Sequence, residues 1–259
     1  MPPRGGHGPG HAVSLLRVWA AGPRAAARSP RARLLIGLLL ALVLLLAWDA
    51  SGADLAVAGW FADATGFRWR DAWWTRGLLH EGGRVAGLLA LAALAAHAFW
   101  PTAATSAAAQ PTRAERLYAL VVVLLVAGAV PALKRLSLSS CPWDLALFGG
   151  VAQHVSHWRL GVPDGGPGRC FPSGHAVTAF ALWGAVLPWR HHRPRRAWAI
   201  AVGVAAAGLL LGAGQVLRGA HYPSHVLWSA WLCAALVVAA ALVQLWLFER
   251  LRLRGRPLP

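Results

Sequence analysis

Charged residues are scarce in this sequence. Only 13% of its 259 residues are Asp, Glu, Lys or Arg, whereas 57% are hydrophobic, and the mean hydropathy is +0.50. The hydrophobic residues lie in long continuous runs instead of short periodic stripes. This composition argues against a soluble globular domain and is typical of a membrane protein.

Lysine is almost absent. Of the 25 Lys and Arg residues, 24 are Arg, which leaves Lys134 as the one lysine in the chain. A lysine at the end of an apolar run can simply extend its charged group toward the membrane surface. The chain uses arginine at every other basic position, so the lysine at this one position is an exception. Lys134 is therefore also a candidate functional residue.

Two further absences exclude classes of function. The formal charge of +16 would suit nucleic acid, but the arginines flank apolar runs, and no platform of aromatic and basic residues accompanies them. Membrane topology and anionic lipid headgroups explain these arginines better, so nucleic acid is not an expected partner. The interiors of the apolar runs lack charged residues, which disfavours an ion or solute channel.

Six apolar runs approach the length of about 20 residues that a helix needs to cross roughly 30 Å of hydrocarbon. They are Leu34–Trp48, Val85–Trp100, Leu117–Leu133, Ala176–Trp189, Ala197–Leu217 and Val226–Phe248. We therefore expect an all-α polytopic membrane protein with six transmembrane helices. One domain, residues 34–248, holds all six helices between basic tails at residues 1–33 and 249–259.

Arginine placement predicts the orientation of these helices, because short cytoplasmic loops accumulate positive charge. Arginines cluster in both terminal tails and in the loops after the second and fourth runs, which all fall on one side. Both termini are therefore expected in the cytoplasm, with residues 50–84, 134–175 and 218–225 facing outward. Tryptophans and arginines of residues 54–84 predict an amphipathic element at the outer membrane interface.

One polar motif opens the fourth apolar run. Ser173, Gly174 and His175 lie at its start, where free backbone N–H groups and a serine hydroxyl can hold an anion. His175 would then face the bound anion. A serine that only caps the helix, beside a packed histidine, is the alternative.

A second polar motif lies between the last two runs. His221 and His225 are four residues apart, a spacing at which two histidines can bind zinc. Pro223 interrupts regular helix between them, however, and the sequence places no clear third ligand. We therefore predict no metal site.

Together these residues carry a resemblance to the type 2 phosphatidic acid phosphatase family, whose active site is shared with vanadium haloperoxidases. The family has three ordered signatures, Lys-x6-Arg-Pro, Pro-Ser-Gly-His and Ser-Arg-x5-His-x3-Asp. The first resembles residues 134–142, the second is intact at residues 172–175, and the third resembles residues 214–225. The resemblance covers roughly residues 85–245, with order and spacing matched.

The resemblance implies a role for each motif residue. His221 would attack phosphorus to form a phosphohistidine, and His175 would protonate the leaving group. Lys134, Ser173 and Gly174 would hold the phosphate oxygens, because phosphoryl transfer depends on positioning and on neutralising negative charge.

Three positions depart from the family pattern. Cys141 and Gln215 stand where the family has arginines, and His225 stands where it has an aspartate. Two arginines are candidates to supply the missing guanidinium donors: Arg218, about one helical turn after Gln215, and Arg169, just before the Pro-Ser-Gly-His signature.

The missing aspartate leaves the orientation of His221 open. A nucleophilic histidine needs an acceptor for its second ring N–H, which fixes the tautomer that presents a free nitrogen to phosphorus. His225 is the first candidate, through one neutral ring nitrogen, and Asp144 is the alternative.

Cysteine is scarce as well, with three in the chain. Cys141 and Cys170 both fall in the predicted periplasmic segment, where disulfides persist. A bond between them would close a loop of about 30 residues, worth roughly 3 to 4 kcal/mol in the chain-entropy account. Two free thiols are the alternative, and Cys233 is expected to be a small apolar residue within the last span.

The resemblance implies a phosphatase that acts, without a cofactor, on a lipid phosphate or diphosphate at the periplasmic face of a bacterial inner membrane. Membrane lipids and the lipid phosphate are its expected partners. Residues 218–225 and the upstream Cys-Pro-Trp-Asp also resemble bacterial lipid A phosphotransferases, in which a second lipid accepts the phosphate. The departures from the pattern leave a non-catalytic lipid-phosphate-binding protein as a third reading.

Overall fold

The computed structural model of the chain describes residues 30–100 and 110–253. Residues up to Leu42 and residues from Val43 onward form separate compact units. The contacts described below lie within the second unit. Most of the two predicted basic tails, residues 1–33 and 249–259, lies outside the described residues.

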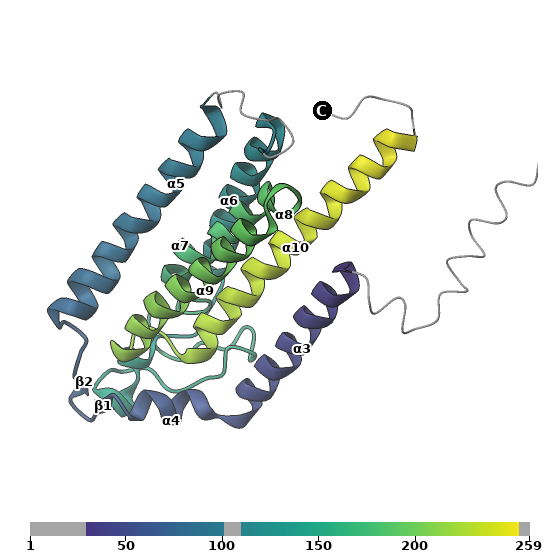
Figure 1. The fold of residues 1–259 in the computed structure, drawn as a ribbon. Helices are drawn as coiled ribbons and strands as arrows, with labels where there is room; N and C mark the ends of the chain where they lie inside the picture. The colour runs from purple at the N-terminus through teal and green to yellow at the C-terminus, as the bar shows by residue number, and fades with distance from the viewer. Residues whose placement is uncertain (1–29, 101–109, 254–259) are drawn as a thin grey trace, which may run out of the picture. The chain divides into compact units, whose positions relative to one another are not determined.

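Helices make up most of the described chain (Figure 1). They are α3 (Pro30–Ser51), α4 (Ala53–Gly59), a π-helix η1 (Trp74–Gly82) that continues into α5 (Gly83–Phe99), α6 (Arg113–Lys134), α7 (Gly174–Phe180), α8 (Trp189–His192), α9 (Pro194–Leu217) and α10 (Pro223–Leu253). Five stretches are long and apolar enough to cross a membrane: Arg31–Ser51, Trp74–Phe99, Arg113–Lys134, Pro194–Leu217 and Pro223–Arg250. The chain is therefore an all-α polytopic membrane protein.

The sixth predicted span, Ala176–Trp189, is not confirmed. Its apolar helical part, Gly174–Val186, is shorter than the other five and changes from α7 to the 3-10 segment η5 (Ala181–Val186). Residues 174–192 nevertheless run along α6 from its end to its start. Gly174 lies beside Lys134 at the end of α6, and His192 Nε2 lies 3.0 Å from Glu115 Oε2 at its start.

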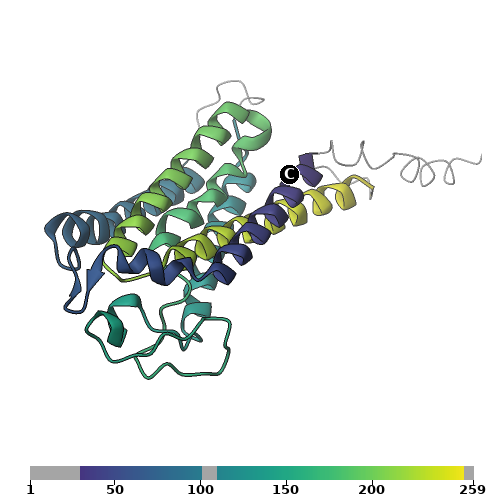
Figure 2. The same ribbon diagram turned by 90° about the horizontal axis from the view of Figure 1, so that it is seen from below.

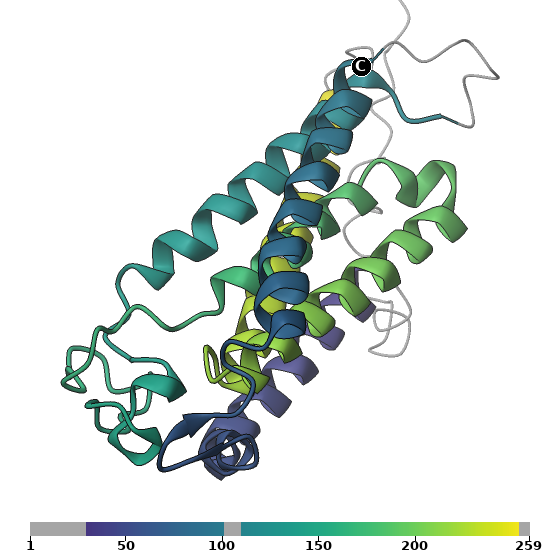
Figure 3. The same ribbon diagram turned by 90° about the vertical axis from the view of Figure 1, so that its left-hand side faces the viewer.

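The core of the second unit lies between α6, α7, α9 and α10, which run side by side (Figures 1 and 3). Lipid tails are as apolar as the helix surfaces, so membrane helices associate largely through close van der Waals packing. Two glycines permit that packing. A Cβ on Gly208 would lie 2.2 Å from the Phe180 ring, and one on Gly184 would lie 2.7 Å from Val123 Cγ2.

An irregular loop between α6 and α7 covers the end of the bundle at which α6 ends (Figures 2 and 3). It contains two short 3-10 turns, η3 (Pro142–Asp144) and η4 (Ala146–Phe148). The buried Asp164 carboxylate accepts hydrogen bonds from the backbone N–H groups of Ser140 and Gly166 and from the Ser140 hydroxyl. These bonds satisfy buried polar groups that have no helix to pair them.

The predicted amphipathic element, residues 54–84, is built from three parts. After α4 comes a hairpin of β1 (Ala62–Asp63) and β2 (Gly66–Phe67), and then η1 begins the second span. Trp60 and Trp73 are 74% and 77% exposed. Exposed tryptophans beside the start of a span suit the depth of the lipid interface, where this side chain is favoured.

Two carboxylates fix the start of α10. Asp49 Oδ2 accepts from Trp228 Nε1 over 2.8 Å, and Asp54 accepts from the backbone N–H and the hydroxyl of Ser224. A buried carboxylate is tolerated only with partners of this kind. Because α10 begins at Pro223, these bonds also hold the turn that carries His221.

Substitution Gly208→Val should lower the stability of the protein in detergent by about 1 to 3 kcal/mol, because the new methyl groups would overlap the Phe180 ring. Gly203→Val in the same helix is the matched control, since nothing lies within 4 Å of a Cβ at Gly203. The midpoint of thermal unfolding measures both variants. Equal midpoints would contradict the close packing of α9 against α7.

Candidate active site

A cavity of about 550 Å³ lies between α5, α6, α7 and α9 at the loop end of the bundle. Its polar lining includes His80, Arg84, Lys134, His175, Thr178, Gln215, Arg218 and His221. Its apolar lining includes Leu88, Leu91, Val123, Ala127, Val177, Ala181 and Leu182. Val123 lies eleven residues before Lys134 along α6, or about 16 Å at 1.5 Å per residue, so the apolar wall extends away from the polar end.

Lys134, Ser173 and Gly174 meet at the junction of α6 and α7. A Cβ on Gly174 would lie 3.5 Å from Lys134 Cδ and 3.8 Å from its Nζ, so the lysine side chain passes directly over the glycine. Ser173 is fully buried at the N-cap of α7, and its hydroxyl has no hydrogen-bond partner among the described residues. The three residues that the sequence grouped together are therefore neighbours in the structure.

Arg218 lines the cavity and Arg169 does not. Arg218 follows α9, where its Nε donates to the Arg70 carbonyl over 2.7 Å and its Nη1 donates to Gln215 Oε1 over 3.3 Å. The Gln215 side chain is buried, and its Nε2 has no partner among the described residues. Arg169 is exposed in the loop, with a left-handed backbone (φ 56°). Of the two candidate arginines, the structure brings only Arg218 to the cavity.

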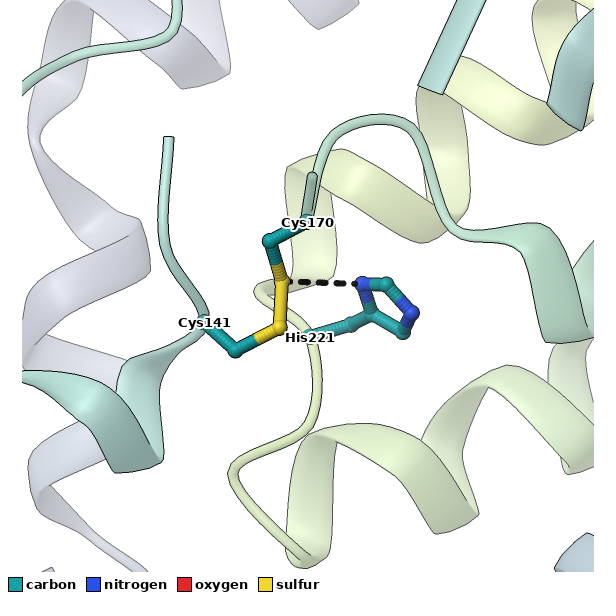
Figure 4. Close-up of side chains that lie close together, drawn as sticks. All are labelled: Cys141, Cys170 and His221. Atoms are coloured by element: carbon teal, nitrogen blue, oxygen red, sulfur yellow. Dashed lines mark hydrogen bonds between the residues drawn. A yellow bond between two sulfur atoms is a disulfide. The ribbon is translucent and has the colours of Figure 1, made fainter. Parts of the chain in front are cut away.

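His221 is buried in the turn between α9 and α10. Its Nδ1 lies 3.5 Å from Cys170 Sγ, and Figure 4 shows Nε2 on the opposite side of the ring, directed away from the sulfur. Burial lowers the pKa of His221 well below its usual value, the positive charge of Lys134 lowers it further, and the Cys170 backbone acts weakly in the opposite direction. The imidazole is therefore neutral at pH 7.

His175 faces the cavity from the first turn of α7. Its Nε2 lies 3.1 Å from the Leu79 carbonyl, and its ring centroid lies 4.7 Å from that of His80. Burial lowers the pKa of His175 to about 4, opposed by the bond to Leu79. This carbonyl belongs to the π-helix η1, a type of helix that is frequent at functional sites.

The two candidate orienting residues occupy different surroundings. The His225 ring lies 5.8 Å from that of His221, centroid to centroid, and its Nδ1 has no partner among the described residues. Asp144 Oδ2 instead accepts from Cys141 N and Trp143 Nε1 within its own turn, and Asp144 is not part of the cavity lining. Neither carboxyl oxygen of Asp144 is bonded to His221.

Cys141 and Cys170 form a disulfide, with Cα atoms 5.2 Å apart, which is the pairing expected from their positions in the sequence. The disulfide joins the turn after Lys134 to the segment before Ser173. Cys141 lines the cavity, and Cys170 is fully buried. Cys233 is a buried free cysteine within α10, as predicted.

Sequence patterns assigned no role to His80, Arg84 and Trp143, all of which line the cavity. His80 and Arg84 come from the junction of η1 and α5, and Trp143 packs under the Arg70 guanidinium at 4.6 Å. The only signal for the first two was their position at the end of the outward segment. A functional role could not be derived from that position alone.

Comparison with protein families settles the relationship. The model of the PAP2 superfamily matches residues 116–249, which is more than half of the chain. The chain belongs to the PAP2 superfamily. No curated protein and no solved structure matches it. The family comprises phosphatases, so this PAP2 protein is a membrane phosphatase, and the matched region contains every motif residue described above.

Substitution Arg218→Gln should lower kcat/KM for phosphate release by about 100-fold, the usual cost of removing one donor to a developing charge. Arg218→Lys should recover only part of the loss, because lysine lacks the planar fork of donors. Arg169→Gln is the matched control and should stay within about twofold of the wild type, as an exposed substitution does. A larger loss in the Arg169 variant than in the Arg218 variant would reverse the assignment.

Proposed function

We propose that this PAP2 protein removes phosphate from a lipid phosphate or diphosphate through a phosphohistidine on His221. The observation that carries the proposal is that one cavity combines a buried histidine and cationic side chains with a long apolar wall. A water-soluble phosphate needs only the polar part. The apolar wall along α5 and α6 suits a hydrocarbon chain that stays between the helices while its headgroup reaches His221.

Charge and hydrogen-bond donors at the polar end support phosphate as the bound group. Lys134 and Arg218 bring positive charge to the cavity, and Gly174 lies beside the lysine side chain. The Gln215 side-chain amide lines the cavity, and the Ser173 hydroxyl is buried next to the lining residue Gly174 without being part of the lining itself. Both are donors without partners among the described residues. Leaving such groups unpaired is costly, and phosphate oxygens would satisfy both.

The proposed reaction has two halves. His221 Nε2 attacks phosphorus while the bond from phosphorus to the lipid oxygen breaks, and His175 gives that oxygen a proton. Water then attacks the phosphohistidine, His175 takes a proton from it, and phosphate leaves. With a pKa of about 4, His175 is neutral at pH 7, but the negative charge of a bound phosphate would raise its pKa and favour its protonation.

His225 is the better supported orienting residue for His221. Its ring lies near that of His221 and has an unpartnered nitrogen, whereas the Asp144 carboxylate is bonded within its own turn. Without a carboxylate at Nδ1, burial would keep His221 neutral and nucleophilic. This arrangement stabilises a developing imidazolium less than an aspartate would.

We infer that the cavity faces the periplasm of a bacterial inner membrane, with both termini in the cytoplasm. Disulfides persist in oxidising compartments, and the disulfide lies at the cavity end. The opposite end holds the arginine cluster of residues 190–196, because Arg190 Nη2 donates to Gln244 Oε1 over 3.0 Å and His192 contacts Glu115. Clustered arginines are retained on the cytoplasmic side.

Purified protein in detergent, given phosphatidic acid, undecaprenyl pyrophosphate and lipid A in turn, tests this function. Release of phosphate from one of them without an acceptor lipid indicates a hydrolase. His221→Ala should abolish release and the acid-labile phosphoenzyme trapped from radiolabelled substrate, whereas His225→Ala should retain a fraction of the rate. Full activity of the His221 variant would contradict the mechanism.

The same assay separates the two alternatives. Phosphate that moves only to a second added lipid indicates a phosphotransferase of the lipid A type, which shares the first half of the reaction. Binding of lipid phosphate without release or transfer indicates a binding protein.

The pH dependence of kcat/KM should reflect the lowered pKa of His221. Protonation removes the nucleophilic lone pair, and a lowered pKa postpones that protonation to lower pH. We therefore expect kcat/KM to show no fall between pH 7 and pH 6, whereas a nucleophilic histidine with an ordinary pKa would give one near 6.5. As the pH falls, histidines whose pKa is lowered in the folded protein become protonated first in the unfolded chain. Folding stability therefore decreases below about pH 6.5, and it must be measured at each pH at which kcat/KM is determined.

A further inference from the structure

The disulfide beside His221 places three potential metal ligands together. Cys141 Sγ, Cys170 Sγ and a ring nitrogen of His221 all lie within 4.8 Å of one another, and they form the one such group among the described residues (Figure 4). In the disulfide form the sulfurs are bonded to each other and are poor ligands. Only thiolates bind metal well.

We propose that reduction of the Cys141–Cys170 disulfide turns this group into a site for a thiophilic divalent cation such as Zn²⁺, held by two thiolates and His221 Nδ1. Three protein ligands of this kind with one open position are an established coordination set for zinc. A dithiol reductant supplies the two electrons and two protons that convert the disulfide into two thiols. The metal then displaces the two thiol protons.

The positions of the ligands fit one ion. Zn–S bonds of about 2.3 Å and Zn–N bonds of about 2.0 Å in tetrahedral geometry separate sulfur from nitrogen by roughly 3.5 Å. That separation is already present between Cys170 Sγ and His221 Nδ1, at 3.5 Å. The Cα atoms of the two cysteines are 5.2 Å apart, so both side chains can reach the same ion after small rotations about χ1.

The site can be reached and can form a thiolate. Cys141 lines the 550 Å³ cavity, which gives a small reductant or a metal ion a path to the sulfurs. Lys134 lines the same cavity as Cys141 and His221. Nearby positive charge favours the thiolate form of cysteine, and two thiolates offset that charge once the metal is bound.

The consequence for catalysis rests on the proposed function. A metal on Nδ1 leaves the proton of the neutral imidazole on Nε2, so the nitrogen that would attack phosphorus loses its lone pair. The reduced, metal-loaded protein is therefore inactive. Oxidation by a disulfide donor, through thiol–disulfide exchange, releases the metal and frees His221. The disulfide would thus switch the nucleophile on when the chain reaches an oxidising compartment.

Cobalt binding tests the site without reference to activity. Full-length protein in detergent is reduced with a phosphine, desalted under argon and titrated with Co²⁺. The reduced wild type should bind one Co²⁺ with the visible bands of tetrahedral cobalt and a thiolate charge-transfer band, which added Zn²⁺ removes. The oxidised wild type should show neither. Thiol counts of three and one per chain confirm the two redox states.

Variants assign the ligands. Cys141→Ala, Cys170→Ala and His221→Ala should each weaken Co²⁺ binding by at least about tenfold, since even outer-shell changes cost 10- to 100-fold. Cys233→Ala is the matched control, because this free cysteine lies within α10, and it should leave the spectrum unchanged. Size-exclusion profiles show whether each variant remains folded. Absence of cobalt bands in reduced wild type, or unchanged bands in the His221 variant, would overturn the proposal.

Activity forms a separate arm. If the oxidised enzyme releases phosphate and the reduced enzyme loaded with Zn²⁺ releases it equally fast, His221 is not captured and the proposal fails. If the oxidised enzyme acts on no phosphate substrate, the proposed function fails, while the cobalt spectra still decide whether the metal site exists.

Discussion

Hydrogen bonds between the approach to α7 and the start of α10 hold the candidate site together. Ser173 N donates to the His225 carbonyl over 3.1 Å, and the Ser229 hydroxyl donates to the Ser173 carbonyl over 2.9 Å. The loop between α6 and α7 has little regular helix, so its polar backbone groups must find such partners at the edge of a membrane. These bonds fix Ser173, in the Pro-Ser-Gly-His signature, against α10. They also bring Cys170, three residues upstream, against His221.

The long helices could be predicted from the sequence because a continuous apolar run has one way to satisfy its backbone in lipid. The path of residues 174–192 could not. Its apolar run, Ala176–Trp189, resembles the others in composition, but the backbone of η5 lies so close to α6 that a Cβ on Gly184 would overlap Val123. Tertiary packing of that kind, and the change from α7 to a 3-10 segment that accompanies it, leaves no periodic signal in the sequence.

Within the site, roles tied to local spacing were predictable and roles created by long-range contact were not. Arg218 follows Gln215 by three residues, and the structure shows them joined by a hydrogen bond. Cys170 and His221 are 51 residues apart, and no motif links them, so their contact emerges only from the fold. His80 and Arg84 lie outside both the motifs and the region matched by the family. Both residues line the cavity because the π-helix before α5 packs against α9.

The three departures from the family pattern make sense as one change in charge. The pattern places two arginines and one aspartate beside the shared lysine, a formal sum of +1 from the three. Cysteine, glutamine and histidine replace them here, and all three are neutral when the histidine is unprotonated, so the sum falls to zero. Arg218 in the cavity restores it to +1. Loss of both arginines alone would have left a buried aspartate with only the lysine to compensate it, and loss of the aspartate alone would have left two buried guanidinium groups in mutual repulsion. Removing the opposite charges together avoids both costs, and it lets a disulfide occupy the space beside the nucleophile.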